Sequence, residues 1–382
     1  MPWKETHVMD QKINMISDWL SGEYSITELS RIYEVSRKTL YKWINRYEKD
    51  SGLQDRSSKP LTMPKSTPPD IIAYIISSKT QHIHWGSRKI LAWLTEHYPY
   101  QKWPAASTTS EILKRHGMVK ARRKRHHTAP YIEPFLNCNQ PNEVWCADFK
   151  GQFKLGAGNL CYPLTLSDSY SRYLLGCWGL AHPNYLNTRS HLESAFREYG
   201  LPSAIRIDNG VPFASVALGG LSSLAVWLIK LGIKPERIEK GHPEQNGRHE
   251  RMHRTLKAES INPPHESFNA QQRAFNQFRT VYNQDRPHEA LGQKTPVSVY
   301  RKSSRVYPDK FSEIEYNSNF SVRRVKPNGA IKWKARELYI SGTLAEEPIG
   351  LKQIDNGIWQ IYYSFYPLGI IDERTFKITP NE

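Results

Sequence analysis

The first part of the chain alternates apolar residues at helical spacing with short polar breaks, and it predicts three helices between residues 10 and 48. Ser25–Glu28 has the capping-box pattern that opens a second, short helix, and Ser36 is placed to cap a third. The apolar residues expected to be buried are Ile13, Ile16 and Leu20 in the first helix and Leu40, Trp43, Ile44 and Tyr47 in the third. This pattern predicts a helix-turn-helix domain over residues 1–50.

A second helical unit is predicted over residues 69–118, after a linker at 51–68 rich in proline, serine and charged residues. Its third helix is expected to open at the capping box Thr108–Glu111 and to end near Gly117. The apolar residues that indicate its first two helices are Ile71, Ile72, Ile75 and Ile76, then Ile90, Leu91 and Leu94. A second helix-turn-helix-like DNA-binding domain fits this pattern.

Strand-like and helix-like segments then alternate over residues 141–300, as in an α/β domain with a mixed sheet. The expected strands are 144–154, 162–169, 173–180, 204–207 and 233–239, and the expected helices are 185–199, 221–231, 243–258 and 268–283. Between this domain and the second helical unit lies a basic linker, residues 119–140.

Short alternating strands separated by glycine, proline and Asn-Gly turns fill residues 301–382. Such a pattern predicts a small β barrel as the last domain. Its basic edge is expected at Arg323, Arg324, Lys326, Lys332 and Lys334, with a purely stabilising or multimerising role as the alternative. The whole chain is therefore predicted to be a multidomain α+β protein.

The charge balance indicates a polyanionic partner. Lysine and arginine total 53 against 37 acidic residues, for a formal net charge of +16, which favours nucleic acid as the partner, with a merely basic, solvated surface as the alternative. No apolar stretch is long enough for a signal peptide or a membrane span, and no membrane partner is expected. The four cysteines lack CxxC spacing, so we expect reduced thiols in a cytoplasmic protein and no zinc site.

The third predicted helix has an exposed basic face that suits a recognition helix in the major groove of double-stranded DNA. The residues expected to contact DNA there are Arg37, Lys38, Tyr41 and Lys42. The alternative interpretation is a three-helix packing or dimerisation unit whose basic face is only solvated. Further DNA contacts are expected at Lys114 and Arg115 in the second unit, and at Arg122, Arg123, Lys124 and Arg125 in the basic linker.

Three carboxylates stand where a two-metal phosphoryl-transfer site needs them. Asp148 lies in one strand-like segment, Asp208 ends another before a turn, and Glu250 lies on a predicted helix. Hard cations take oxygen ligands, and two Mg²⁺ ions can hold the attacking and leaving oxygens of a phosphodiester in line. Asp168 is better explained as a turn residue or as a partner of Arg172, and His242 and His249 are less favoured candidates for general bases.

Around these carboxylates the chain resembles the DDE transposases and retroviral-type integrases, specifically bacterial insertion-sequence transposases. The motifs are Trp145-Cys146-Ala147-Asp148, Asp208-Asn209-Gly210-Val211-Pro212-Phe213 and Asn246-Gly247-Arg248-His249-Glu250-Arg251, with Arg254-Thr255-Leu256-Lys257 following. The resemblance implies a ribonuclease-H-like core, an SH3-like C-terminal module, two Mg²⁺ ions for which Mn²⁺ can substitute, and no nucleotide cofactor. It also implies DNA contacts at Asn246, Arg254 and Lys257, a homodimer or higher homo-oligomer on paired DNA ends, and action at the bacterial nucleoid.

The position of the glutamate needs a choice between two residues. A spacing of 35 residues after Asp208 leads to Glu244, whereas the motif register leads to Glu250, with 41 residues between. The excess fits a surface insertion around Gly219–Ser223, and Glu250 shares a helix face with Arg254 and Lys257. Glu244 would then serve only the helix entrance.

The predicted function is DNA transposition: binding of terminal repeats, metal-dependent strand cleavage, and strand transfer by the released 3′-OH. The alternatives are an inactive or domesticated transposase that acts as a sequence-specific DNA-binding regulator, and a plain nuclease or ribonuclease H. Intact carboxylates at Asp148, Asp208 and Glu250 argue against the first, and the flanking DNA-binding units argue against the second.

Overall fold

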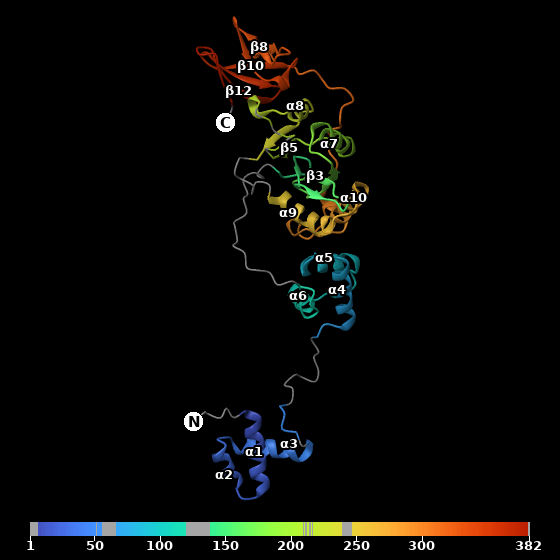
Figure 1. The fold of residues 1–382 in the computed structure, drawn as a ribbon, viewed down its shortest axis with the longest axis vertical. Coiled ribbons are helices and arrows are strands. Elements are labelled where there is room, and N and C mark those ends of the chain that lie inside the picture. The colour runs from blue at the N-terminus through green and yellow to red at the C-terminus, as the bar shows by residue number, and fades with distance from the viewer. Residues whose placement is uncertain are drawn as a thin grey trace. The chain divides into compact units, whose positions relative to one another are not determined.

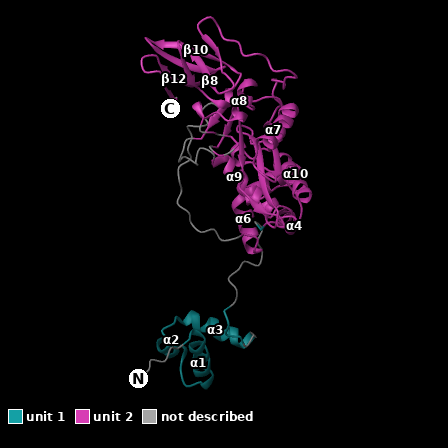
Figure 2. Cartoon of the chain, turned by 45° about the horizontal axis from the view of Figure 1, so that its top comes forward, with its two compact units in different colours: residues 1–66 teal, residues 67–382 magenta. Residues whose placement is uncertain are grey.

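The computed structural model describes residues 7–50, 52–55, 66–119, 138–208, 210, 212–213, 215, 217–238 and 247–380. The chain divides into two compact units, residues 1–66 and residues 67–382 (Figure 2). Each unit is described by itself.

The first unit is a bundle of three helices, α1 (Val8–Ser21), α2 (Ile26–Ile32) and α3 (Arg37–Asp50). Both predicted caps are present: the Ser25 hydroxyl accepts from the backbone N–H of Glu28 at 3.3 Å, and Ser36 accepts from Thr39 N–H at 3.2 Å. The buried side chains come from all three helices and are Met15, Ile16, Leu29, Leu40, Trp43 and Ile44.

The prediction for the buried face of α1 is confirmed for Ile16 and wrong for Ile13 and Leu20. Ile13 and Leu20 are 50% and 57% exposed, whereas Met15 and Ile16 are buried. Helix α1 has apolar residues on more than one side, so spacing alone did not identify the side that packs against α2 and α3.

The second unit begins with three more helices, α4 (Pro69–Gln81), α5 (Ser87–His97) and α6 (Ala106–Arg115). The expected capping box at Thr108–Glu111 is wrong, because α6 already begins at Ala106. Thr109 instead lies inside the helix, where its hydroxyl donates to the Ala105 carbonyl at 3.2 Å. Gly117, with φ +68°, follows the end of α6 as expected.

A mixed sheet forms the centre of the second unit and confirms the predicted alternation (Figure 1). Its strands are β1 (Val144–Phe149), β2 (Phe153–Lys154), β3 (Leu160–Asp168), β4 (Leu174–Leu180), β5 (Ala204–Ile207) and β6 (Lys234–Arg237). The order is β2-β3-β1-β5-β6, with β4 on β3. The pairs β1–β5 and β5–β6 are parallel, and β3 pairs antiparallel with β1, β2 and β4.

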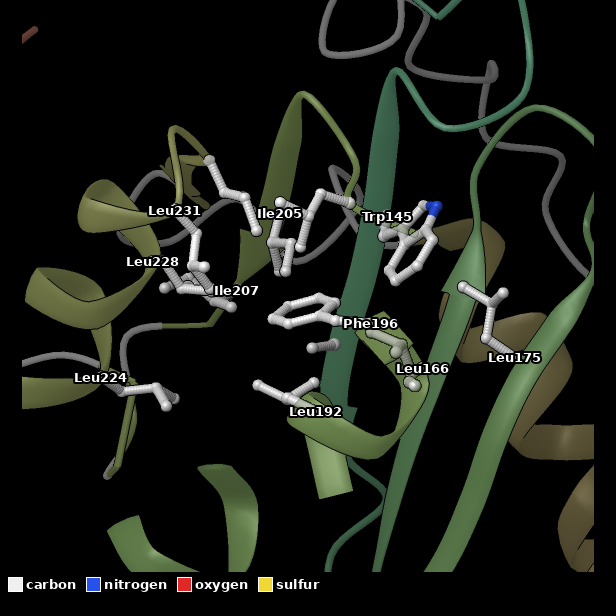
Figure 3. Packing of buried hydrophobic residues seen from close by; sticks show 14 of the residues in the cluster. Trp145, Leu166, Leu175, Leu192, Phe196, Ile205, Ile207, Leu224, Leu228 and Leu231 are labelled. Carbon is white, nitrogen blue, oxygen red and sulfur yellow. The ribbon is translucent and has the colours of Figure 1, made fainter. Parts of the chain in front are cut away.

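Helices cover both faces of this sheet. Helices α7 (Tyr185–Tyr199) and α8 (Ser223–Lys230) pack on one face, where Phe196 lies among the strand residues Trp145, Ile205 and Ile207 (Figure 3). The other face is covered by α9 (Gly247–Leu256), a π-helical turn η4 (Lys257–Ile261) and α10 (Phe268–Gln284). Successive side chains along β1 and β3 thus point to opposite faces of the sheet, one toward α7 and α8 and the other toward α9 and α10.

The last seven strands form open sheets in the part of the chain that the structure describes. The strands are β7 (Ser321–Arg324), β8 (Ala330–Trp333), β9 (Arg336–Tyr339), β10 (Pro348–Asp355), β11 (Ile358–Tyr363), β12 (Tyr366–Asp372) and β13 (Lys377–Pro380). Their pairing gives a five-stranded sheet, β13-β12-β11-β10-β7, and a β8–β9 hairpin. The expected closed, SH3-like barrel is therefore not confirmed, although the short strands expected within residues 301–382 are present.

These C-terminal strands share a hydrophobic core with α8. Ala225, Val226 and Ile229 of α8 pack with Ile349, Leu351 and other strand residues, and Lys230 forms an ion pair with Glu347. The Gly-rich insertion, expected on the surface, is half-buried, and a Cβ at Gly219 would lie 3.1 Å from Leu368 Cδ2. The insertion therefore contacts the C-terminal sheet.

The described ranges of the second unit also contain the short helical turns η2 (Leu218–Gly220), η5 (Glu289–Leu291), α11 (Pro296–Val299) and η6 (Gly342–Leu344). Contacts also join α5 to the segment after α10, where Arg88 pairs with Glu289 at 2.7 Å. None of the helices in the described ranges is long and apolar enough to cross a membrane.

Candidate active site

Two of the predicted carboxylates lie at the ends of neighbouring parallel strands. The β1–β5 register pairs Ala147 with Ile207, so Asp148 and Asp208 follow at equivalent positions. Parallel strands end at the same edge of a sheet, which places both aspartates at that edge. Asp148 is mostly buried, and Asp208 is intermediate in exposure.

The third carboxylate lies on α9. That helix turns His249, Met252, His253 and Leu256 toward the sheet, while Glu250 remains exposed. The charge of Glu250 nevertheless acts on Asp148, as does that of Asp208. The charges of Asp208 and Glu250 thus both reach Asp148.

Both aspartates have raised pKa values. Burial, followed by the nearby charge of Asp208 and then that of Glu250, raises the pKa of Asp148 to about 7, against a favourable backbone hydrogen bond. Burial also raises the pKa of Asp208, although its Oδ1 accepts from Gly210 N–H at 3.1 Å. Like charges in a partly desolvated cluster of oxygen donors are the setting that a hard divalent cation stabilises, so these residues fit Mg²⁺ or Mn²⁺.

A buried polar network lies beside Asp148. The Thr165 hydroxyl lies 2.7 Å from Nε2 of both His249 and His253 and 3.1 Å from the Asp148 carbonyl oxygen. His249 Nδ1 also lies 3.0 Å from the Ser167 hydroxyl, and His253 Nδ1 lies 3.8 Å from Asp148 Oδ2. Burial lowers the pKa of His249 to about 3 and, with the charges of His249 and Lys150, that of His253 to about 2.

This network differs from what the sequence suggested for the histidines. His249 was considered as a general base, but it is buried against Thr165 and Ser167. His253 was not singled out, although its position four residues after His249 places both on one helix face. Among the described residues, Asp148, His249 and His253 offer ligand atoms that all lie within 4.8 Å of one another.

Asp168 has the turn role expected of it. Its carboxylate accepts from the backbone N–H groups of Asn142 and Ser171 at 3.3 and 3.5 Å. Arg172 donates to the Ser169 carbonyl oxygen. This carboxylate therefore holds the turn after β3.

The residues predicted to bind DNA fall into three groups. Those on α3 are exposed, namely Arg37, Lys38, Tyr41 and Lys42. Also exposed are Lys114, Arg115, Arg254 and Lys257, of which Arg115 pairs with Glu111 at 3.5 Å and Lys257 begins the π-helical turn. Outside the described residues lie Arg122, Arg123, Lys124, Arg125 and Asn246, together with His242 and Glu244. DNA contact at all of them stays a prediction.

Family models match most of the chain. Residues 138–243 and residues 231–296 each match an integrase core domain. Residues 11–60 match a helix-turn-helix domain, and residues 39–113 match a homeodomain-like domain. These matches support the predicted helical N-terminal region and the integrase-type, ribonuclease-H-like core with its mixed sheet.

Sequence comparison identifies a relative that matches about half of this chain. The insertion element IS407 uncharacterized 31.7 kDa protein of Burkholderia multivorans is 30% identical over 199 residues, 51% of this chain and 69% of the relative. Solved structures with some likeness include the HTLV-2 integrase catalytic core domain in complex with magnesium, in its trimeric form, at 18% identity and TM-score 0.34, covering 43% of this chain and 99% of that one. The simian T-cell lymphotropic virus intasome in complex with PP2A regulatory subunit B56 gamma is 19% identical at TM-score 0.37, covering 77% and 97%. At such TM-scores the structural likenesses add no weight.

Proposed function

This chain belongs to the family of insertion-element transposases with a retroviral-integrase-type core, and from this we propose that it cleaves the ends of its element and joins them to target DNA. The observation that carries the proposal is the placement of two aspartates at one edge of the sheet, with Glu250 on the helix beside it. Asp148 and Asp208 follow paired positions on parallel strands, and Glu250 acts on Asp148 from α9.

We assign the metal-binding role to Asp148, Asp208 and Glu250, with Mg²⁺ as the cation expected and Mn²⁺ as a substitute. When bound there, two divalent cations supply Lewis-acid activation of the attacking hydroxyl and neutralise charge on the phosphate. The carboxylates fix where that charge is placed, and the sheet and α9 hold them rigidly. No nucleotide cofactor is required.

The proposed reaction has two displacements at phosphorus. In the first, water attacks the phosphodiester at the element end, the bond from phosphorus to the 3′ oxygen breaks, and that oxygen takes up a proton to become a 3′-OH. In the second, this 3′-OH attacks a target phosphodiester, loses its proton, and displaces the target 3′ oxygen. Each displacement exchanges one P–O bond for another, so neither needs an external energy source.

The remaining parts of the chain are assigned to DNA recognition and assembly. Residues 1–50 and 69–118 would bind the terminal repeats, with 51–68 and 119–140 as linkers between the domains. In the core at 141–300, Arg254 and Lys257 lie exposed beyond Glu250 on the same helical segment, suited to phosphates beside the reacting bond. Residues 301–382 would contact DNA or a second copy in a homodimer or larger synaptic complex, acting in the bacterial cytoplasm at the nucleoid.

A labelled duplex carrying the ends of the encoding element tests this function. Wild-type protein, Glu250→Gln and Glu244→Gln are each incubated with the duplex and a target plasmid, in Mg²⁺ and then in EDTA. We expect Mg²⁺-dependent nicking and joining by the wild type and by Glu244→Gln, and neither by Glu250→Gln. Activity lost in Glu244→Gln but kept in Glu250→Gln would reassign the glutamate. Tight binding without nicking by the wild type would instead indicate a DNA-binding regulator.

A further inference from the structure

The Thr165 hydroxyl has three neighbours at hydrogen-bond distance. They are the Asp148 carbonyl oxygen at 3.1 Å and the Nε2 atoms of His249 and His253, both at 2.7 Å. A hydroxyl has one proton to donate and two lone pairs that accept. Because the carbonyl can only accept, the three contacts are satisfied together when Thr165 donates to Asp148 and accepts from both rings.

This arrangement fixes the tautomers of the two histidines. Both rings then carry a proton on Nε2, which leaves Nδ1 of each ring as the atom able to offer a lone pair. The lone pair of His249 accepts from the Ser167 hydroxyl at 3.0 Å. That of His253 points to Asp148 Oδ2, 3.8 Å away, which is beyond hydrogen-bond distance.

Two electron-pair donors thus face each other across a short gap. His253 is 5% exposed, so bulk water does not surround its ring. Metal bonds to imidazole nitrogen and carboxylate oxygen are each about 2.1 Å long, so one cation held between these two atoms would reach both.

We propose that His253 Nδ1 and Asp148 Oδ2 bind the same divalent cation, which gives the carboxylate site one nitrogen ligand. This assignment deepens the proposed transposase site and rests on it, since Asp148 is taken as a ligand in both. Thr165 and His249 are positioning residues, because they hold the His253 ring in the tautomer that exposes Nδ1 toward Asp148.

A nitrogen ligand changes which cation the site prefers. Mg²⁺ takes oxygen ligands, whereas the divalent transition metals, Mn²⁺ among them, also accept an imidazole nitrogen. The chain should therefore bind Mn²⁺ more tightly than an all-carboxylate site would. Substitution of His253 should weaken Mn²⁺ binding by at least about tenfold and Mg²⁺ binding by less.

Pulsed electron paramagnetic resonance of bound Mn²⁺ tests the ligand directly, in the full-length chain without DNA. We expect the wild-type complex to show electron spin-echo modulation from a coupled ¹⁴N nucleus, and the pattern to change to that of ¹⁵N when only histidine is ¹⁵N-labelled. His253→Gln should lose the coupling. His191→Gln is the matched control, because His191 is a half-buried histidine on α7, which packs on the opposite face of the sheet, and it should keep the coupling.

The labelled wild type keeps the test valid even if His253→Gln fails to fold. Absence of nitrogen coupling in the wild type, or its persistence in a folded His253→Gln protein, overturns the assignment. Nicking in Mg²⁺ is measured in parallel to separate this proposal from the function. Nicking without nitrogen coupling would contradict only the assignment of His253 as a ligand. Nitrogen coupling without nicking would contradict only the proposed transposase activity.

Discussion

Ala147 on β1 and Ile207 on β5 are paired in parallel register, and each is followed directly by an aspartate. This single pairing places two motifs 60 residues apart at the same edge of the sheet. The strands are buried through Trp145 and Ile205, so the register that positions the aspartates is also the register that buries the core. Site geometry and fold stability are thus coupled at these two strands.

Asp208→Asn should therefore abolish chemistry while sparing DNA binding. The amide keeps the size of the side chain and its contact with Gly210 but removes the charge that binds a cation. We expect nicking and joining to fall by at least about 10⁴-fold, as when a principal catalytic group is removed. Gel-shift affinity for element-end DNA should stay within a few-fold. Asp309→Asn, at an exposed position after the core, is the control. Equal nicking by both variants would remove Asp208 from the site.

Lys38→Ala and Lys42→Ala should weaken binding to element-end DNA through the salt-dependent part of the affinity. Both lysines are exposed on α3, and each phosphate contact contributes about 0.9 to the slope of log affinity against log salt. In fluorescence-anisotropy titrations, the slope of log affinity against log salt should be smaller in magnitude by about 2 for the double variant than for the wild type. Lys12→Ala is the comparison, since Lys12 already pairs with Asp55 at 3.0 Å and lies 3.8 Å from the centre of the Trp43 ring. An unchanged slope in the double variant would favour the packing role for the three-helix unit.

Sequence patterns predicted the local elements better than their long-range assembly. Helix α5 begins and ends where its periodicity indicates, because one apolar stripe decides its packing. Helix α1 has apolar residues on several sides, so the spacing placed Ile13 and Leu20 on its buried face when they are exposed. Closure of the C-terminal strands depends on pairing between distant edge strands, and part of their core comes from α8 instead. A local sequence pattern does not indicate that α8 packs against these strands.

The candidate site likewise combines residues that the sequence motifs indicated with a contact that they did not. The motifs predict Asp148, Asp208 and Glu250 as the site, because chemistry restricts the residue types at those positions, and the strand register places the two aspartates at one sheet edge. The contact between His253 and Asp148 depends on the rotation of α9 about its axis and on Thr165 of β3 beneath it. A spacing of four residues between two histidines says only that they share a helix face, and it does not name the strand they meet.

Ile229→Ala should destabilise the second unit strongly. Ile229 is 1% exposed and packs from α8 against the C-terminal strands. Truncating such a side chain costs about 2–5 kcal/mol through lost burial and a cavity. Urea denaturation followed by tryptophan fluorescence measures the loss. Leu186→Ala, at a position 73% exposed, should change the free energy of unfolding by less than about 0.5 kcal/mol. A similarly small change for Ile229→Ala would show that α8 and the C-terminal strands do not depend on each other.

Gly200→Ala should cost more stability than Gly158→Ala, although both glycines have positive φ, +81° and +87°. A Cβ at Gly200 would lie 2.7 Å from the Ser303 carbonyl oxygen and 2.9 Å from that of Arg305, whereas nothing lies within 4 Å at Gly158. The 303–305 segment cannot easily retreat, because the Arg305 carbonyl accepts from Leu201 N–H at 2.7 Å. We expect an extra loss of about 1–3 kcal/mol for Gly200→Ala. Equal thermal denaturation midpoints for the two variants would contradict this packing.

Mild acid should destabilise the second unit partly through His288. Burial, and then the charges of Lys89 and Arg286, lower the pKa of this histidine from 6.5 to about 3. Above pH 6.5 the ring is neutral in both the folded and the unfolded chain, so it adds no pH dependence there. Below that value the unfolded chain takes up a proton that the folded chain does not, so stability falls as pH drops toward about 3.

Between about pH 7.5 and about pH 5 this one group should remove about 2 kcal/mol of folding free energy. His288→Gln cannot take up the proton, so the free energy of unfolding of that variant should fall less steeply over the same interval in urea titrations. His116→Gln, at an exposed residue after α6, should keep the wild-type dependence. If His288→Gln and the wild type lose equal stability on acidification, the imidazole is protonated in the folded chain, and the neutral, buried state assigned to it is wrong.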